Sequence, residues 1–125
     1  SKIQYIKKGA KKDFIIIDAG MNDFMRPALY DAVHKIIPIR KSKSKLKGTI
    51  EFVGPICEST CKFGSYKNYQ KMSENDFVAI TNVGAYGSSL SSNYNSRPLI
   101  AELLVNKNKI KYIRKKQDLL KLINS

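Results

Sequence analysis

A cysteine and a glutamate stand next to each other in this 125-residue chain, just after a segment typical of a β-strand. Residues 49–53 (TIEFV) are mostly β-branched or aromatic, and Gly54-Pro55 ends the strand because proline cannot donate to a sheet. Cys57 and Glu58 therefore lie on a loop at a strand end, where scaffolds commonly present reactive groups. A thiol in that place can donate a proton, and a carboxylate can bind a cation. The alternative is a small buried cysteine beside a solvated loop acid.

A second pair, Arg26 and Tyr30, has the chemistry to bind a carboxylate. Pro27 is acceptable in the first turn of a helix, and apolar residues recur after it with helical spacing, which predicts a helix over residues 26–34. Arg26 and Tyr30 would then lie one turn apart on the same face. A guanidinium offers a planar pair of donors and a phenol a single donor. The alternative is an ion pair between Arg26 and Asp23 at the surface, with Tyr30 in the core.

The elements that must position these residues are mostly strands. Runs of apolar, largely β-branched and aromatic residues between turn residues predict strands at 3–6, 14–18, 49–53, 77–83, 101–105 and 109–114. The first two are expected to form a hairpin, as are the last two, and residues 117–123 a short helix. The predicted fold is a single, mainly β domain over residues 1–125 with peripheral helices, arranged as a β-barrel or a sandwich.

Three further segments bear on the site. Residues 61–69 are polar and aromatic and contain a glycine, so they are predicted to form a loop. Gly84-Ala85-Tyr86-Gly87 interrupts the preceding strand and places the Tyr86 phenol among small residues that let another group approach closely. Residues 88–98 are rich in hydroxyl and amide groups, and the tyrosine among them favours an ordered polar segment over a linker.

The chain carries 23 Lys and Arg residues against 10 Asp and Glu residues, a formal net charge of +13. This excess fits a basic β-domain that binds nucleic acid, and a non-catalytic interaction module is a further alternative. The basic residues are spread along the chain apart from a cluster in residues 40–47, however, and a codon bias towards lysine explains them without a polyanion. Tyr86 and Tyr94 also stand among Gly, Ser and Asn, unlike the stacking aromatics of a basic binding surface.

Cys57 and Cys61 lack the spacing and the further ligands of a zinc site, so no metal centre is predicted and both are expected to be free thiols. Free thiols suit a reducing cytoplasm. His34 is expected to be a hydrogen-bonded structural residue. No apolar run is long enough to cross a bilayer, and lysines interrupt the N-terminal apolar residues where a signal peptide needs a continuous run. The chain begins without Met in a strand-like segment, so a fragment or a processed piece is expected.

Five stretches, in this order, resemble the C-terminal domain of the diaminopimelate decarboxylase family. They are Asp18-Ala19-Gly20-Met21-Asn22-Asp23, Arg26-Pro27-Ala28-Leu29-Tyr30, Gly54-Pro55-Ile56-Cys57-Glu58-Ser59, Gly84-Ala85-Tyr86-Gly87 and Ser91-Ser92-Asn93-Tyr94-Asn95-Ser96-Arg97-Pro98. The resemblance runs from about Tyr5 to Arg114. One departure is Cys61, where the family commonly has an acid. Decarboxylases of ornithine, arginine and carboxynorspermidine share the general layout, but the second and fifth stretches are most similar to the diaminopimelate enzymes.

The resemblance implies a lyase of lysine biosynthesis that depends on pyridoxal 5′-phosphate and converts meso-2,6-diaminopimelate to L-lysine and CO₂. A related decarboxylase acting on another basic amino acid is the alternative. The resemblance also implies a β domain of the alanine racemase and group IV decarboxylase type. The N-terminal (β/α) barrel that binds most of the cofactor in that family is absent from this chain. A homodimer with active sites shared across its interface is implied as well, and this portion alone is expected to be inactive.

The same resemblance assigns roles to individual side chains. Cys57 resembles the family's proton donor, and Glu58 resembles the acid that receives the distal ammonium of the substrate. Arg26 and Tyr30 resemble the pair that holds the distal carboxylate. Tyr86 resembles a residue that contacts both the cofactor and the substrate.

Overall fold

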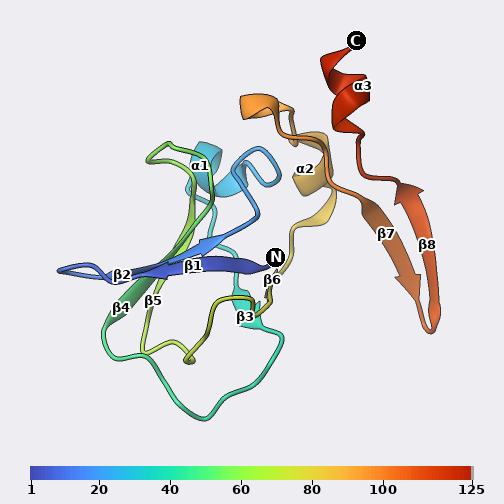
Figure 1. Ribbon diagram of the computed structural model, residues 1–125. Helices are drawn as coiled ribbons and strands as arrows, with labels where there is room; N and C mark the ends of the chain where they lie inside the picture. Colours follow the sequence, from blue (N-terminus) through green and yellow to red (C-terminus); the bar gives the residue numbers. More distant parts are fainter. Residues whose placement is uncertain (125) are drawn as a thin grey trace.

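The computed structural model describes residues 1–124, and short strands make up most of their regular structure (Figure 1). The strands are β1 (Ile3–Lys7), β2 (Asp13–Ile17), β3 (Ile36–Pro38), β4 (Thr49–Val53), β5 (Lys62–Lys67), β6 (Val78–Ile80), β7 (Glu102–Asn106) and β8 (Lys109–Arg114). The helices are α1 (Arg26–Tyr30), α2 (Gly84–Ser89), the 3-10 helix η1 (Tyr94–Ser96) and α3 (Leu119–Ile123). The predicted mainly β fold with peripheral helices is confirmed.

The largest sheet contains four strands in the order β1-β2-β4-β5. β1 and β2 form the predicted antiparallel hairpin, β2 and β4 are parallel, and β4 and β5 are antiparallel. Ile50 and Phe52 of β4 are fully buried while Thr49, Glu51 and Val53 are half-buried, which is the two-residue period of a strand. The strand before Cys57 is thus an inner strand with a partner on each side, and it gives the following loop a rigid base.

Two smaller antiparallel sheets complete the structure, with β3 paired to β6 and β7 paired to β8. The second pair confirms the hairpin predicted near the C-terminus. The start of β1 also bonds to the segment before β6, where the Ile3 N–H donates to the Asp76 carbonyl over 2.8 Å. The strands of residues 1–124 therefore form an open sheet with smaller neighbours, and they close no barrel.

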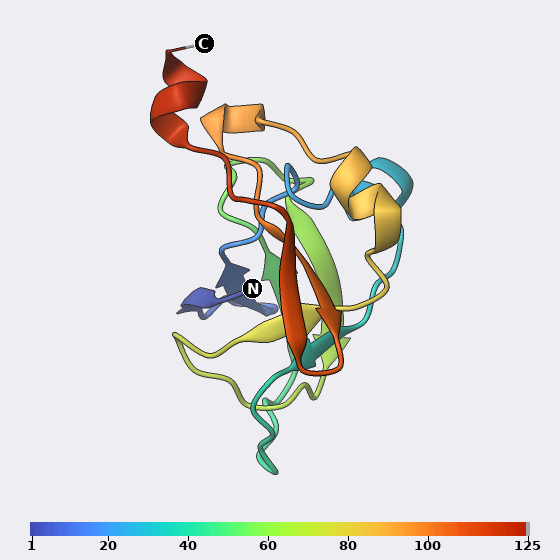
Figure 2. The same ribbon diagram turned by 90° about the vertical axis from the view of Figure 1, so that its right-hand side faces the viewer.

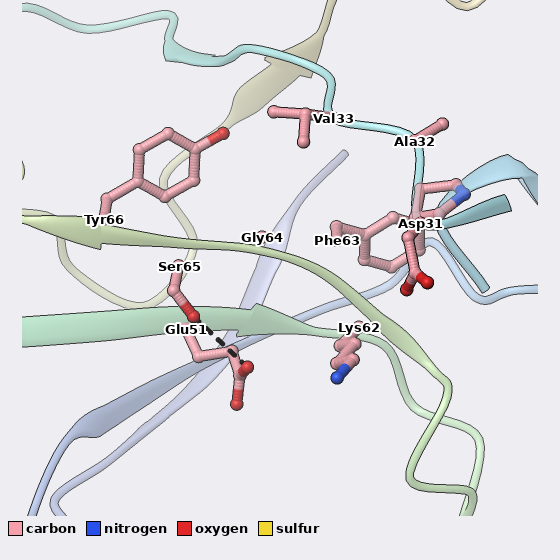
Figure 3. Close-up of a pocket in the computed structure, with 10 residues that line it drawn as sticks. Asp31, Ala32, Val33, Glu51, Lys62, Phe63, Gly64, Ser65 and Tyr66 are labelled. Atoms are coloured by element: carbon pink, nitrogen blue, oxygen red, sulfur yellow. Dashed lines mark hydrogen bonds between the residues drawn. The ribbon is translucent and has the colours of Figure 1, made fainter.

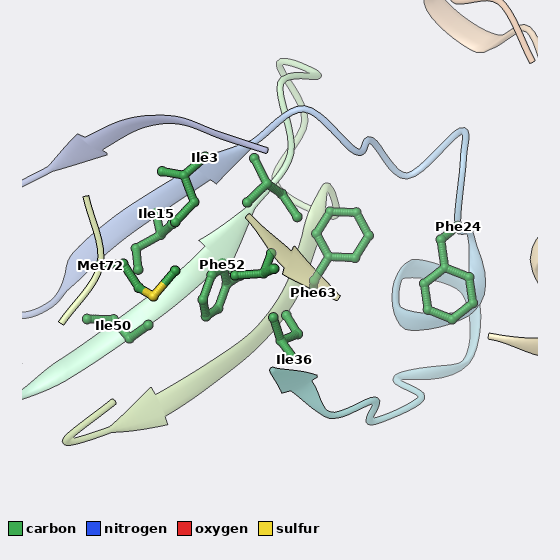
Figure 4. Close-up of a cluster of buried hydrophobic side chains, with 10 residues drawn as sticks. Ile3, Ile15, Phe24, Ile36, Ile50, Phe52, Phe63 and Met72 are labelled. Carbon is green, nitrogen blue, oxygen red and sulfur yellow. The ribbon is translucent and has the colours of Figure 1, made fainter. Parts of the chain in front are cut away.

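Buried side chains of the four-stranded sheet meet those of β3 and β6 in one hydrophobic cluster (Figure 4). Phe52 packs edge-on against the rings of Tyr66 and Tyr69, with centroid distances of 5.7 and 5.2 Å. The Tyr66 hydroxyl donates to the His34 carbonyl over 3.0 Å, and the Tyr69 hydroxyl donates to the Ile36 carbonyl over 2.8 Å. Burial raises the pKa of Tyr69 to about 12. The two phenols thus connect the β5 region to β3.

The prediction of a loop over residues 61–69 is wrong, because residues 62–67 form β5 at the edge of the sheet. The segment lacks a run of β-branched residues, and Gly64 adopts a φ of +146°. Its backbone nevertheless pairs with β4, and Phe63 enters the core. Pairing with a neighbouring strand, rather than local propensity, decides this element.

The predicted helix over residues 26–34 continues only as far as Tyr30. Asp31 adopts a left-handed φ of 52°, which ends α1. Val33 contributed to the helical spacing, but its side chain is 95% exposed. The one turn that does form still places Arg26 and Tyr30 on the same face.

The chain between β6 and η1 also differs from expectation. The strand predicted over residues 77–83 is shorter (β6, Val78–Ile80), and the small residues after it form α2 rather than an irregular break. Asn82 and Gly84 take left-handed φ values of 56° and 60°, which turn the chain between β6 and α2. The predicted C-terminal helix is present as α3, and the Asp118 side chain caps it by accepting from the Leu120 N–H over 2.9 Å. None of the helices in residues 1–124 has the length and apolarity needed to span a bilayer.

The basic cluster of residues 40–47 is bonded to the rest of the domain at several points, and Asp76 provides one of them. The Asp76 carboxylate accepts from the Ser73 N–H over 2.8 Å and pairs with the Arg40 guanidinium over 3.0 Å. The Ser73 N–H and then the Arg40 guanidinium hold the pKa of this carboxyl below its ordinary value of 3.8. Figures 1 and 2 show the loop that contains the cluster at the end of the molecule opposite α1 and α2.

Asp76 is expected to make the stability of this chain dependent on acid pH. Its pKa is lower in the folded chain than in the unfolded chain, so its contribution is fully present above pH 3.8 and is lost as the pH falls through the folded value. Asp76→Asn should therefore lower the free energy of unfolding more at pH 7 than at pH 3, which urea titrations at both pH values measure. An equal loss at the two pH values would show that the carboxylate charge at Asp76 does not stabilise the fold.

Candidate functional site

The loop that follows β4 is closed on itself and anchored to the protein. The Gly54 N–H donates to the Cys61 carbonyl over 2.8 Å, and the Cys61 N–H donates to the Glu58 carbonyl over 3.0 Å. Ile56 is buried, with 6% of its surface exposed. A Cβ at Gly54 would lie 2.4 Å from the Cys61 Sγ and 2.6 Å from the Ala19 carbonyl oxygen, so only glycine allows this approach to the segment after β2.

Cys57 and Glu58 lie on the exposed side of this anchored loop. They line an open cleft of about 520 Å³ together with residues of β4 and the start of β5. The alternative of a buried Cys57 is therefore wrong, whereas Cys61 is the buried cysteine of the pair. Both thiols are free, as predicted, and the Cys61 Sγ accepts from the Met21 N–H over 3.4 Å. Cys57 thus offers an exposed thiol, and Cys61 is a packing residue.

Two side chains hold the carboxylate of Glu58. The Tyr94 hydroxyl of η1 donates to Oε1, and the Thr60 hydroxyl donates to Oε2 over 3.4 Å. The sequence indicated an ordered segment around Tyr94 but not its partner, because the two residues are 36 positions apart. The polar, tyrosine-containing composition of residues 88–98 was the available signal.

Arg26 and Tyr86 form a second contact, between α1 and α2. The Arg26 guanidinium carbon lies over the Tyr86 ring, 5.5 Å from its centroid. The Tyr86 side chain remains 64% exposed and that of Tyr30 62%, so both hydroxyls are accessible. Tyr30 is therefore not a core residue. The ion pair of Asp23 is formed with Arg97, over 3.4 Å, which leaves the alternative of a surface pair between Asp23 and Arg26 unsupported.

Arg97 connects the η1 region to the turn after β2. Its Nε donates to the Asn22 Oδ1 over 2.9 Å, and its Nη2 donates to the Asp18 carbonyl over 2.7 Å. Asn22 is fully buried, and its backbone carbonyl accepts from the Ser92 N–H over 2.9 Å. The sequence singled out both stretches but not this connection, which positions η1 and therefore Tyr94.

A separate hollow of about 290 Å³ lies on the β5 side of the sheet (Figure 3). It contains the Ser65 hydroxyl, which donates to Glu51 over 3.2 Å, but none of the five candidate residues. His34 lies in the core rather than in either hollow. It is 7% exposed, its Nδ1 lies 3.1 Å from the Thr81 carbonyl, and its ring packs against Phe24. Its expected structural role is consistent with this environment.

The five candidate residues lie at one end of the molecule in two groups. Figures 1 and 2 both show α1, α2, η1 and the loop between β4 and β5 at the same end. Glu58 presents a negative charge and Arg26 a positive charge, while the phenols and the thiol are neutral donors. This set can bind an ammonium and an anionic group and can supply a proton. It suits a small molecule with charges of both signs.

Comparisons with known proteins agree with this description. Residues 1–84 match the family model described as the pyridoxal-dependent decarboxylase, C-terminal sheet domain. The chain is 45% identical over 119 residues to the diaminopimelate decarboxylase of Helicobacter pylori, an alignment that covers 95% of this chain and 29% of that protein. The corresponding enzyme of Aquifex aeolicus is 40% identical over 118 residues, covering 94% and 28%.

Solved structures show the same relationship. The diaminopimelate decarboxylase of M. jannaschii in complex with L-lysine superposes with a TM-score of 0.89 at 37% identity, covering 98% of this chain and 28% of that one. The Helicobacter pylori enzyme with L-lysine gives a TM-score of 0.85 at 44% identity, covering 98% and 30%. The chain thus spans less than a third of the length of these relatives. It belongs to the pyridoxal-dependent decarboxylase family, of which it forms the C-terminal sheet domain.

Proposed function

We propose that this chain is the C-terminal part of a diaminopimelate decarboxylase, which converts meso-2,6-diaminopimelate to L-lysine and CO₂. The observation that carries this proposal is the anchored loop that exposes Cys57 and Glu58 together, in a chain 45% identical to such an enzyme. A proton donor beside an ammonium-binding carboxylate suits a substrate whose α-carbon gains a proton while its other amino group stays charged. The same loop would serve a related decarboxylase of another basic amino acid. Measuring which substrate the enzyme prefers therefore distinguishes the two functions.

The cofactor of the family fits these residues as one edge of its site. The exposed Tyr86 phenol can donate to an anionic group such as a phosphate, and the cation of Arg26 lies against the same ring. When bound, pyridoxal phosphate supplies an electron sink for the negative charge that remains at the α-carbon after CO₂ leaves. We place most of its contacts on the N-terminal (β/α) barrel found in this family.

Each candidate residue of this chain would then have its own role in the reaction. The Cys57 thiol gives its proton to the former α-carbon, and the thiolate that remains takes up a proton from solvent when the cleft is open again. Glu58 binds the distal ammonium. Arg26 and Tyr30, one turn apart on α1, bind the distal carboxylate. A substrate without that carboxylate would leave the Arg26 charge without its partner in a closed site, which opposes its binding.

The complete enzyme is proposed to be a homodimer in which this domain of one protomer completes the site on the barrel of the other. Four of the five proposed residues, Tyr30, Cys57, Glu58 and Tyr86, are exposed in this chain. They are therefore available to a second surface that would close the cleft. The free thiols suit the reducing cytoplasm, where we place this enzyme.

An activity assay tests the proposed function. The full-length enzyme with added pyridoxal phosphate is expected to release CO₂ from meso-diaminopimelate and to form L-lysine, whereas the 125-residue chain alone is expected to release none. The assay follows ¹⁴CO₂ from carboxyl-labelled substrate, with ornithine and arginine as competing substrates. Preference of the full-length enzyme for ornithine or arginine would replace the proposed substrate. CO₂ release by the 125-residue chain would contradict the proposed need for the barrel.

A further inference from the structure

Glu58 is held by two neutral donors, and they contact different oxygens of its carboxylate. The Tyr94 hydroxyl donates to Oε1 and the Thr60 hydroxyl to Oε2. An ionised carboxylate has about four acceptor positions on its two oxygens, so both oxygens can still accept from an ammonium. The hydroxyls orient the carboxylate and leave its negative charge uncompensated. An Arg or Lys in their place would neutralise the charge that an ammonium needs.

Tyr94 is the better fixed of the two donors. Thr60 is an exposed residue of the same loop as Glu58, and its hydroxyl is 3.4 Å from the carboxylate. Tyr94 belongs to a different part of the chain, and its backbone is held at both ends of η1. Its N–H donates to the Ser92 hydroxyl over 3.3 Å, and its carbonyl accepts from the Arg97 N–H over 3.4 Å.

The support of Tyr94 extends into the buried part of the domain. The Ser92 N–H donates to the carbonyl of the fully buried Asn22, and the Arg97 side chain donates to the Asn22 Oδ1. Arg97 also pairs with Asp23, whose side chain is 6% exposed. The Tyr94 phenol is therefore presented to Glu58 from a segment that is tied to the turn after β2, while Glu58 itself lies on a separate loop.

From this geometry we propose that Tyr94 is a positioning residue for substrate recognition: its phenol fixes the Glu58 carboxylate in the orientation that receives the distal ammonium. Because Glu58 has this ligand only if the protein acts on diaminopimelate, the role of Tyr94 rests on the proposed function. Tyr94 makes no contact with the reacting α-carbon in this role. Its loss is therefore expected to weaken binding of the substrate more than the proton transfer at Cys57.

The test is Tyr94→Phe in the full-length enzyme, which removes one hydroxyl and keeps the ring. A hydrogen bond to a charged group is worth a tenfold or larger change in an equilibrium constant, so we expect kcat/KM for meso-diaminopimelate to fall about tenfold, mainly through KM. The matched control is Tyr112→Phe, which removes the hydroxyl of the 60% exposed Tyr112 in β8 and should leave kcat and KM unchanged.

A second substrate separates a positioning role from a structural one. 2-Aminopimelate keeps the distal carboxylate of diaminopimelate but lacks the distal ammonium, so Tyr94→Phe should leave its kcat/KM unchanged. An equal loss for both substrates, or no loss for either, would overturn the role of Tyr94 while the wild-type activity leaves the proposed function standing. A wild-type enzyme without activity on meso-diaminopimelate would instead overturn the proposed function, and the role of Tyr94 with it.

Discussion

Replacing Cys57 with alanine in the full-length enzyme is expected to lower kcat by about 10²- to 10⁴-fold, the range that a positioned general acid contributes. The Cys57 side chain is exposed in the cleft and is no part of the hydrophobic core, so the fold should be retained. The matched control is Cys61→Ser, since Cys61 belongs to the same loop but its thiol is buried, whereas that of Cys57 is exposed. Thermal unfolding of both variants separates a loss of chemistry from a loss of structure.

The same variant tests whether the active sites are shared. A Cys57→Ala protomer and a protomer without the cofactor-binding lysine of the barrel should each form a nearly inactive homodimer. When equal amounts exchange subunits, about one quarter of the wild-type activity should return, because half of the dimers are mixed and each mixed dimer has one intact site of two. Subunit exchange is followed with differently tagged protomers. Proven exchange without recovered activity would place Cys57 in the site of its own protomer.

Arg26→Ala is expected to lower kcat/KM for meso-diaminopimelate by about 30- to 1,000-fold, or about 2–4 kcal/mol, through the lost contact with the distal carboxylate. The contact of Arg26 with the Tyr86 ring cannot account for a change of this size, since an exposed cation–π contact is worth about 0.5–1 kcal/mol. Arg26→Lys keeps the charge but loses the planar pair of donors, so it should recover part of the loss.

The matched control for Arg26 is Arg40→Ala. Arg40 is also an arginine paired with a neighbour, in its case Asp76, but it lies in the loop at the opposite end of the molecule. The Arg40→Ala substitution should leave kcat/KM unchanged. If Arg26→Ala left the kinetics unchanged as well, the distal carboxylate would have to be bound by other residues, and Arg26 would serve only to pack against Tyr86.

Several parts of the fold could be predicted because short-range signals decide them. The β-branched and aromatic residues at 49–53 predict β4, and Gly54-Pro55 predicts its end. The loop position of Cys57 follows from those signals, but its exposure does not, because a buried cysteine was an open alternative that only the structure excludes. The two hairpins were predictable for the same reason, because each is closed by a few turn residues.

Other elements were predicted wrongly, because the segment whose pairing decides each of them lies far away in the sequence. β5 is a strand because its backbone pairs with β4, although its own residues have little preference for one. The helix that begins at Arg26 is one turn long because Asp31 has a left-handed backbone conformation and Ile36 pairs with β6. The helical spacing of apolar residues predicts neither feature.

The sequence by itself determined that the thiol and acid of Cys57 and Glu58 follow a strand on a loop and that the guanidinium of Arg26 begins a helix, whereas the helix that contains Tyr86 was not predicted. Only the tertiary structure decided which of them meet. Tyr94 reaches Glu58 across 36 positions, and Arg97 reaches Asn22 across 75. Such contacts depend on the path of the whole chain through the core, and the local residue pattern that sets a strand or a turn carries no information about that path.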